Sequence, residues 1–100
     1  MSAIRVVLVE NPSLERGTLA ALLEREPGLE VVAHVTDGRA ALAALVAHAP
    51  DVLLTDAELP NMTGFELAAV VQLNHPDIKV VMLKDTLVAD LADAIRTIAR

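Results

Sequence analysis

The fold is decided by residues 52–64, which read VLLTDAELPNMTG. A mostly apolar run ends on the carboxylate of Asp56, and a loop marked by Pro60 and Gly64 then leads into a helix-like segment. Such a run predicts a buried β-strand, with Asp56 at its carboxyl end. Open α/β sheets bind their ligands at this edge, so Asp56 is the first candidate site residue.

Two further apolar runs also end on charged side chains. Residues 4–9 precede Glu10, and residues 80–83 precede Lys84. Because the carboxyl ends of parallel strands meet at one edge of a sheet, we expect both side chains to lie close to Asp56. Two acids and one lysine would form a small charged pocket, able to hold a divalent cation and a phosphoryl group.

The composition bounds the class of protein. The chain of 100 residues fits one domain, residues 1–100, with a real core. Hydrophobic residues make up 54% of the chain and aromatic residues 1%, so the core must consist of Val, Leu, Ile and Ala. The absence of Cys excludes disulfides and thiolate metal sites.

Charge and hydropathy predict where the protein is located and what it contacts. The net charge of -6 argues against binding of this chain to a nucleic acid backbone. The start of the chain lacks the pattern of a signal peptide, and no apolar run approaches the ~20 residues of a membrane span. We therefore expect a soluble cytoplasmic protein that contacts neither nucleic acid nor membrane.

Strand-like and helix-like segments alternate along the chain, which is typical of an α/β fold with a parallel sheet. We expect four strands, at residues 4–9, at 30–35, directly before Asp56, and at 78–83. We expect four helices, the first beginning near Ser13 and Leu14, the second capped by Asp37, the third at about 64–74 with Thr63 and Glu66 in capping-box spacing, and the last capped by Asp85 or Thr86.

The apolar stripes predict which helix faces are buried. The inner face of the second helix should carry Ala41, Leu42, Leu45 and Val46, and that of the last helix Leu87, Leu91, Ile95 and Ile98. Residues 67–73 have almost no polar face, so the third helix should be buried on more than one side.

Four stretches, in this order, carry a resemblance to a known family. They read IRVVLVEN, LEVVAHVTDGRAAL, PDVLLTDAELPNMTGFELA and LKDTLVADLADAIRTIA. Together they resemble the receiver domain of bacterial two-component response regulators, and most nearly the LuxR/NarL-type regulators. The resemblance implies a flavodoxin-like (CheY-like), doubly wound parallel sheet. It also implies a place in phosphorelay signalling that controls a transcriptional output.

The same resemblance assigns roles at the sheet edge. It makes Asp56 the phosphoacceptor and Lys84 the contact to the phosphoryl oxygens. Glu10, Asn11, Asp56 and the main-chain carbonyl of Glu58 would hold Mg²⁺, a cation that prefers oxygen ligands. A sensor histidine kinase would be the phosphoryl donor, and the chain would be a phosphoprotein, not an enzyme.

The chain departs from the family at two points. Asn11 stands where the family normally has Asp, and an amide adds no charge, so Mg²⁺ should bind more weakly. In the family a helix and a further strand precede the lysine, whereas residues 80–83 here run directly into Lys84. We therefore expect the 2-1-3-4-5 sheet to be truncated to about four strands, without the family's fourth helix. Val80 and Met82 would then lie on an exposed edge, which favours self-association.

Plainer interpretations of the site residues stay open. Asp56 could only start the turn at Pro60, Glu10 and Asn11 could only begin a loop, and Lys84 could be a surface lysine beside a helix. The three His residues have no spacing that suggests a metal site, and we expect them at the surface or at element ends: His34, His48 and His75.

Three functions are compatible with this sequence. The first is a receiver module that accepts a phosphoryl group on Asp56. The second is a degenerate receiver that acts as a dimerisation or interaction module without phosphorylation. The third is a small Mg²⁺-dependent phosphatase or hydrolase with Asp56 as nucleophile. The sequence disfavours it, because Glu58, two residues after Asp56, is only a loose substitute for the general acid of haloacid-dehalogenase-type enzymes.

Overall fold

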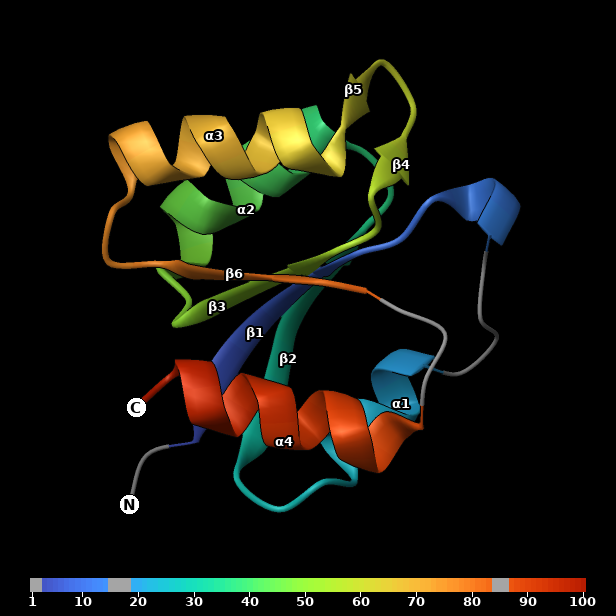
Figure 1. The fold of residues 1–100 in the computed structure, drawn as a ribbon, viewed down its shortest axis with the longest axis vertical. Helices are drawn as coiled ribbons and strands as arrows, with labels where there is room; N and C mark the ends of the chain where they lie inside the picture. The colour runs from blue at the N-terminus through green and yellow to red at the C-terminus, as the bar shows by residue number, and fades with distance from the viewer. Residues whose placement is uncertain (1–2, 15–18, 84–86) are drawn as a thin grey trace.

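The fold is known from a computed structural model, which describes residues 3–14, 19–83 and 87–100. Its centre is a parallel sheet of four strands in the order β2-β1-β3-β6 (Figure 1). These strands are β1 (Ile4–Val9), β2 (Leu29–Val35), β3 (Val52–Thr55) and β6 (Lys79–Met82). The predicted truncated, flavodoxin-like sheet is confirmed. A short antiparallel hairpin, which the sequence did not predict, follows β3 and consists of β4 (Glu58–Leu59) and β5 (Met62–Thr63).

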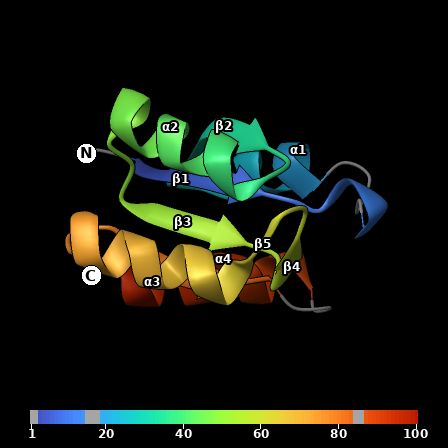
Figure 2. The same ribbon diagram turned by 90° about the horizontal axis from the view of Figure 1, so that it is seen from above.

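Helices cover both faces of the sheet. They are α1 (Leu19–Glu24), α2 (Gly38–His48), α3 (Gly64–Asn74) and α4 (Val88–Ile98), and a 3-10 turn, η1, spans Pro12–Leu14. The first and last helices pack on one face, while α2 and α3 pack on the other (Figure 1). Seen from above, β1 and β3 lie side by side and point to the same end, where the hairpin lies (Figure 2).

The two cores follow from the alternation of side chains along the central strands. Val6 and Leu8 of β1 lie in the core beneath α1 and α4, whereas Val7 and Val9 lie in the core beneath α2 and α3. All four side chains are fully or almost fully buried. A strand that is buried on both faces needs a continuous apolar sequence, and residues 4–9 come close to providing it.

Local capping signals account for the starts of two helices. The Asp37 carboxylate accepts a hydrogen bond from the N–H of Ala40 at 2.7 Å. Thr63 and Glu66 form the predicted capping box at the start of α3. The N-cap of α4 is Leu87, which makes no side-chain cap, and the alternative caps Asp85 and Thr86 lie outside the described residues.

Some predicted inner faces were wrong at their margins. Val46 is 75% exposed and Leu87 is 72% exposed, whereas Leu45 and Leu91 are buried. Each of these helices contacts the sheet along one stripe only. Val46 is one position off that stripe, so it is rotated by about 100° and points to solvent. Leu87 is exposed because it precedes α4 as its N-cap.

The prediction for the third helix was also wrong. Its buried residues are Gly64, Leu67 and Val71, whereas Phe65 and Leu73 are exposed. The helix is an outer layer that touches the sheet with one face, so its apolar composition leaves hydrophobic side chains on the surface.

The edge strand β6 pairs with β3, and Val80 and Met82 in it are partly buried. Self-association through this edge stays a prediction. In the parts of the chain that the structure describes, no helix has the length and apolar character to cross a bilayer.

Candidate functional site

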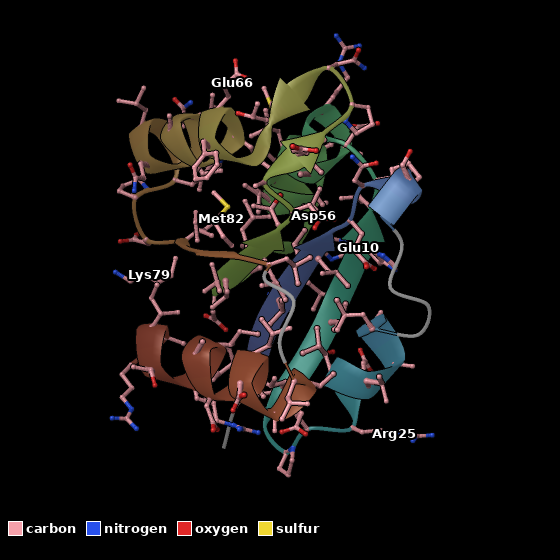
Figure 3. The ribbon with its side chains drawn as sticks, turned by 45° about the vertical axis from the view of Figure 1, so that its right-hand side comes forward. Glu10, Arg25, Asp56, Glu66, Lys79 and Met82 are labelled. Atoms are coloured by element: carbon pink, nitrogen blue, oxygen red, sulfur yellow. The ribbon has the colours of Figure 1, made fainter. Side chains whose placement is uncertain are left out.

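The candidate site lies at the carboxyl end of the two central strands. The pairing of β1 with β3 sets Val9 opposite Thr55, so Glu10 and Asp56 leave the sheet at the same edge (Figure 3). The main-chain N–H of Asp56 donates to the carbonyl of Val9 at 3.0 Å, which fixes this register up to the strand ends. The structure thus brings the two predicted acids together.

Asp56 is held tightly by its surroundings. Only 2% of its surface is exposed, and its Oδ2 accepts a hydrogen bond of 2.7 Å from the main-chain N–H of Asn11. On its far side, the start of α3 packs so closely that a Cβ on Gly64 would overlap the main-chain oxygen of Asp56. The segment after β1 therefore holds the carboxylate, whereas the start of α3 packs against the main chain of Asp56.

Asn11 connects three segments of this edge. Besides its main-chain bond to Asp56, its side-chain Nδ2 donates to the carbonyl of Glu58 at 3.0 Å. Its Oδ1 accepts a hydrogen bond of 2.9 Å from the main-chain N–H of Ser13. The amide therefore links the end of β1 to the start of β4.

Glu10 has a partner to which sequence reasoning assigned no role. One of its carboxylate oxygens lies 2.8 Å from Nε2 of His34, a residue of β2. Glu10 is 2% exposed, whereas the imidazole is 37% exposed. When protonated, His34 forms an ion pair with the buried acid. The sequence signal for this contact is weak, because it depends on the register between two strands.

Lys84 lies outside the described residues, so its contact to a phosphoryl group stays a prediction. The structure does place its neighbour, Leu83, at the same edge, where the N–H of Leu83 donates to the carbonyl of Thr55 at 2.8 Å.

The groups at this edge have the chemistry that a hard cation requires. Glu10 and Asp56 offer carboxylate oxygens, Glu58 offers its main-chain carbonyl, and Asn11 has an amide oxygen. Mg²⁺ is bound in proteins by few carboxylates together with such neutral oxygens and water. The described residues contain no cluster of three His, Cys, Asp or Glu side chains suited to a metal.

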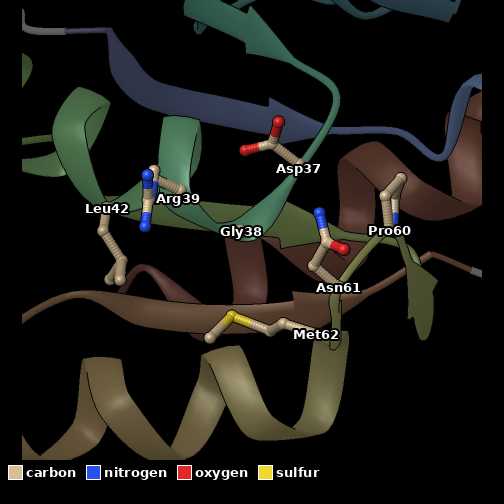
Figure 4. A pocket seen from close by; sticks show the side chains of 7 residues that line it. All are labelled: Asp37, Gly38, Arg39, Leu42, Pro60, Asn61 and Met62. Carbon is tan, nitrogen blue, oxygen red and sulfur yellow. The ribbon is translucent and has the colours of Figure 1, made fainter.

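A separate cleft lies on the other side of the hairpin, between it and the start of α2 (Figure 4). Its volume is about 620 Å³, and none of the predicted site residues that the structure describes lines it. The lining consists of Asp37, Gly38, Arg39, Leu42, Pro60, Asn61 and Met62.

The sequence of the chain is similar to that of a known family and of several known proteins. Residues 6–99 match the response regulator receiver domain family. The chain is 36% identical over 95 residues to protein-glutamate methylesterase/protein-glutamine glutaminase 5 of Anaeromyxobacter dehalogenans, covering 95% of this chain and 26% of that protein. It is 40% identical over 80 residues to the corresponding protein 1 of Paramagnetospirillum magneticum, covering 80% of this chain and 21% of that protein. The chain thus spans between about a fifth and a quarter of the length of these relatives.

Solved structures show the same architecture. The signal receiver domain of the response regulator NarL from Mycobacterium tuberculosis has a TM-score of 0.89 and 26% identity, with 99% of this chain and 98% of that chain covered. A DNA-binding response regulator of the LuxR family from Staphylococcus aureus has a TM-score of 0.87 over 97% of this chain and 99% of that chain. At 21% identity, the second likeness concerns the fold alone.

Proposed function

This chain belongs to the response regulator receiver domain family, and from this premise we propose that Asp56 accepts a phosphoryl group. The observation that carries the proposal is the convergence of Asp56 with Glu10 and Asn11 at one sheet edge. The chain acts as the acceptor in a transfer and not as a conventional enzyme. A cytoplasmic location agrees with this role and stays a prediction.

The transfer needs little from the protein beyond position and charge. An oxygen of the Asp56 carboxylate bonds to phosphorus while the bond from phosphorus to a histidine nitrogen of the donor breaks. The donor imidazole keeps the electron pair, and Asp56 becomes an acyl phosphate. Receiver domains take their phosphoryl group from sensor histidine kinases, and we propose such a kinase as the partner.

Receiver domains generally bind Mg²⁺ at this position, and we propose the same cation here. When bound, it would neutralise charge on the phosphoryl oxygens. The residues to hold it are Glu10, Asn11, Asp56 and, through its carbonyl, Glu58. The chain's own residues fix the Asp56 carboxylate in place. The main-chain N–H of Asn11 does so through a hydrogen bond of 2.7 Å.

We propose transcriptional control as the output of the signal. The likeness to the receiver domain of NarL supports it. The names of the curated relatives support a different output, a protein-glutamate methylesterase.

Intact-mass spectrometry tests the proposal. The chain is incubated with MgCl₂ and a small acyl phosphate, and one added phosphoryl group is expected. Asp56→Ala should abolish the uptake, whereas Asp77→Ala, at an exposed position outside the site, should retain it. Uptake that persists in Asp56→Ala would contradict the assignment, provided that circular dichroism shows both variants to be folded.

An interaction module without phosphorylation is the second candidate. The exposed apolar side chains of α3, Phe65 and Leu73, favour it, because a contact surface needs such groups. No phosphoryl uptake by a folded chain, together with a dimer in light scattering, would support this candidate. Steady hydrolysis of a phosphoester would instead support the phosphatase.

A further inference from the structure

We propose that the side-chain amide of Asn11 is a latch that holds the phosphoacceptor edge together without a metal ion, and that a divalent cation must displace it. The inference rests on the proposed function, because it concerns how the same site takes up its cation. It assigns to Asn11 a positioning role that competes with cation binding.

Two contacts fix the orientation of the amide. Oδ1 accepts from the N–H of Ser13 at 2.9 Å, and Nδ2 donates to the carbonyl of Glu58 at 3.0 Å. If the amide were turned over, a donor would face the Ser13 N–H and an acceptor would face the Glu58 oxygen. Both contacts would then be repulsive, so the orientation in the structure is the stable one.

This orientation is the wrong one for binding a cation. The Glu58 carbonyl is among the oxygens expected to hold Mg²⁺, and it already accepts a hydrogen bond from the side-chain Nδ2 of Asn11. A cation shared by Asn11 and Glu58 needs the amide oxygen, not the amide nitrogen, on its side. The amide must therefore turn over, which breaks the bonds to both Glu58 and Ser13.

Asn11→Asp would remove the latch and leave the other groups of the site in place. It has nearly the same shape and keeps an oxygen for the Ser13 N–H, but it has no donor for the Glu58 carbonyl. It would also place a negative charge beside the buried Asp56. Without a cation, repulsion between the carboxylate of Asn11→Asp and that of Asp56 therefore destabilises the edge. A bound cation would relieve this repulsion.

Calorimetric titration with MgCl₂ and thermal unfolding followed by circular dichroism test the latch. Asn11→Asp should bind Mg²⁺ at least tenfold more tightly than the wild-type chain, a difference of about 1.4 kcal/mol. It should melt below the wild type in EDTA and gain far more from Mg²⁺. Asn74→Asp, which adds the same charge at an exposed position at the end of α3, should leave the affinity for Mg²⁺ unchanged. Equal affinities of wild type and Asn11→Asp would overturn the proposal.

A measurement on the wild-type chain covers the case in which Asn11→Asp does not fold in EDTA. In nuclear magnetic resonance spectra, Mg²⁺ should shift the side-chain NH₂ signals of Asn11 together with the main-chain N–H of Ser13. Shifts at Asp56 that leave the Asn11 side chain unchanged would contradict the latch.

Failure of the latch and failure of the proposed function give different results. If the wild type accepts no phosphoryl group but Mg²⁺ shifts its Asn11 side-chain signals together with the N–H of Ser13, the latch stands and phosphorylation is refuted. If both chains are phosphorylated and Mg²⁺ leaves the side-chain signals of Asn11 in the wild type unchanged, the function stands and the latch is wrong.

Discussion

Replacement of Gly64 by alanine tests how tightly the third helix holds the phosphoacceptor strand. Gly64 is buried at the start of α3, and its N–H donates to the carbonyl of Ala57 at 2.7 Å. A Cβ at this position would overlap the main-chain oxygen of Asp56 and lie 3.0 Å from its carbonyl carbon. Because these atoms belong to the main chain, no side-chain rotation relieves the overlap, and the helix or the loop must move.

Two opposing effects decide the magnitude. Alanine is favoured over glycine within a helix by at most about 1 kcal/mol. Overpacking that forces a backbone shift costs about 1–3 kcal/mol, and a rigid neighbour places the cost at the upper end. The helix preference offsets part of that cost, so we expect Gly64→Ala to lower the free energy of unfolding by about 2 kcal/mol. For a domain of this size, each kcal/mol lowers the midpoint of thermal unfolding by roughly 4–8 °C.

The measurement is urea and thermal unfolding followed by far-ultraviolet circular dichroism, because the chain has neither Trp nor Tyr for fluorescence. Gly38→Ala is the matched control, since its Cβ would meet only the flexible side chain of Met62 and should cost less. A Gly64→Ala chain as stable as the wild type, or no less stable than Gly38→Ala, would refute the reasoning.

Three other substitutions have expected outcomes in the same unfolding assay. Ala49→Gly should raise the free energy of unfolding by about 1 kcal/mol, because Ala49 ends α2 with a φ of 45°, where a side chain is unfavourable. A loss of stability would show that the methyl group of Ala49 stabilises the fold by more than its left-handed backbone costs. Thr63→Ala should lower it by about 1 kcal/mol through loss of the capping box of α3, whereas Thr97→Ala, at an exposed position in α4, should cost less. Leu45→Ala should cost about 2–5 kcal/mol, but Val46→Ala less than about 0.5 kcal/mol, since only the first side chain is buried; similar costs would contradict the assigned inner face of α2.

Much of the fold follows from local features of the sequence. The apolar runs before Glu10 and Asp56, the cap at Asp37 and the capping box at Thr63 each lie within a few consecutive residues. Strand ends and caps depend on neighbours along the chain, so the sequence is sufficient to predict them. The convergence of the two acids then follows from parallel pairing alone.

The partner of Glu10 was beyond such reasoning. The pairing of β1 with β2 shifts by one residue between Val6 and Val7, so that Leu8 lies opposite His34. Because paired residues point to the same face, this irregularity turns His34 to the side of Leu8 and Glu10. With a regular register, His34 would pair with Val9 and point to the opposite face.

The sequence by itself determined which residues end the strands, and therefore which charged groups gather at one edge of the sheet. Only the tertiary structure decided how those groups are engaged: His34 against Glu10, the amide nitrogen of Asn11 against the carbonyl of Glu58, and α3 with Phe65 exposed. The reason is physical. Strand ends are set by neighbouring residues, whereas side-chain partners depend on register and on packing between segments far apart in the chain.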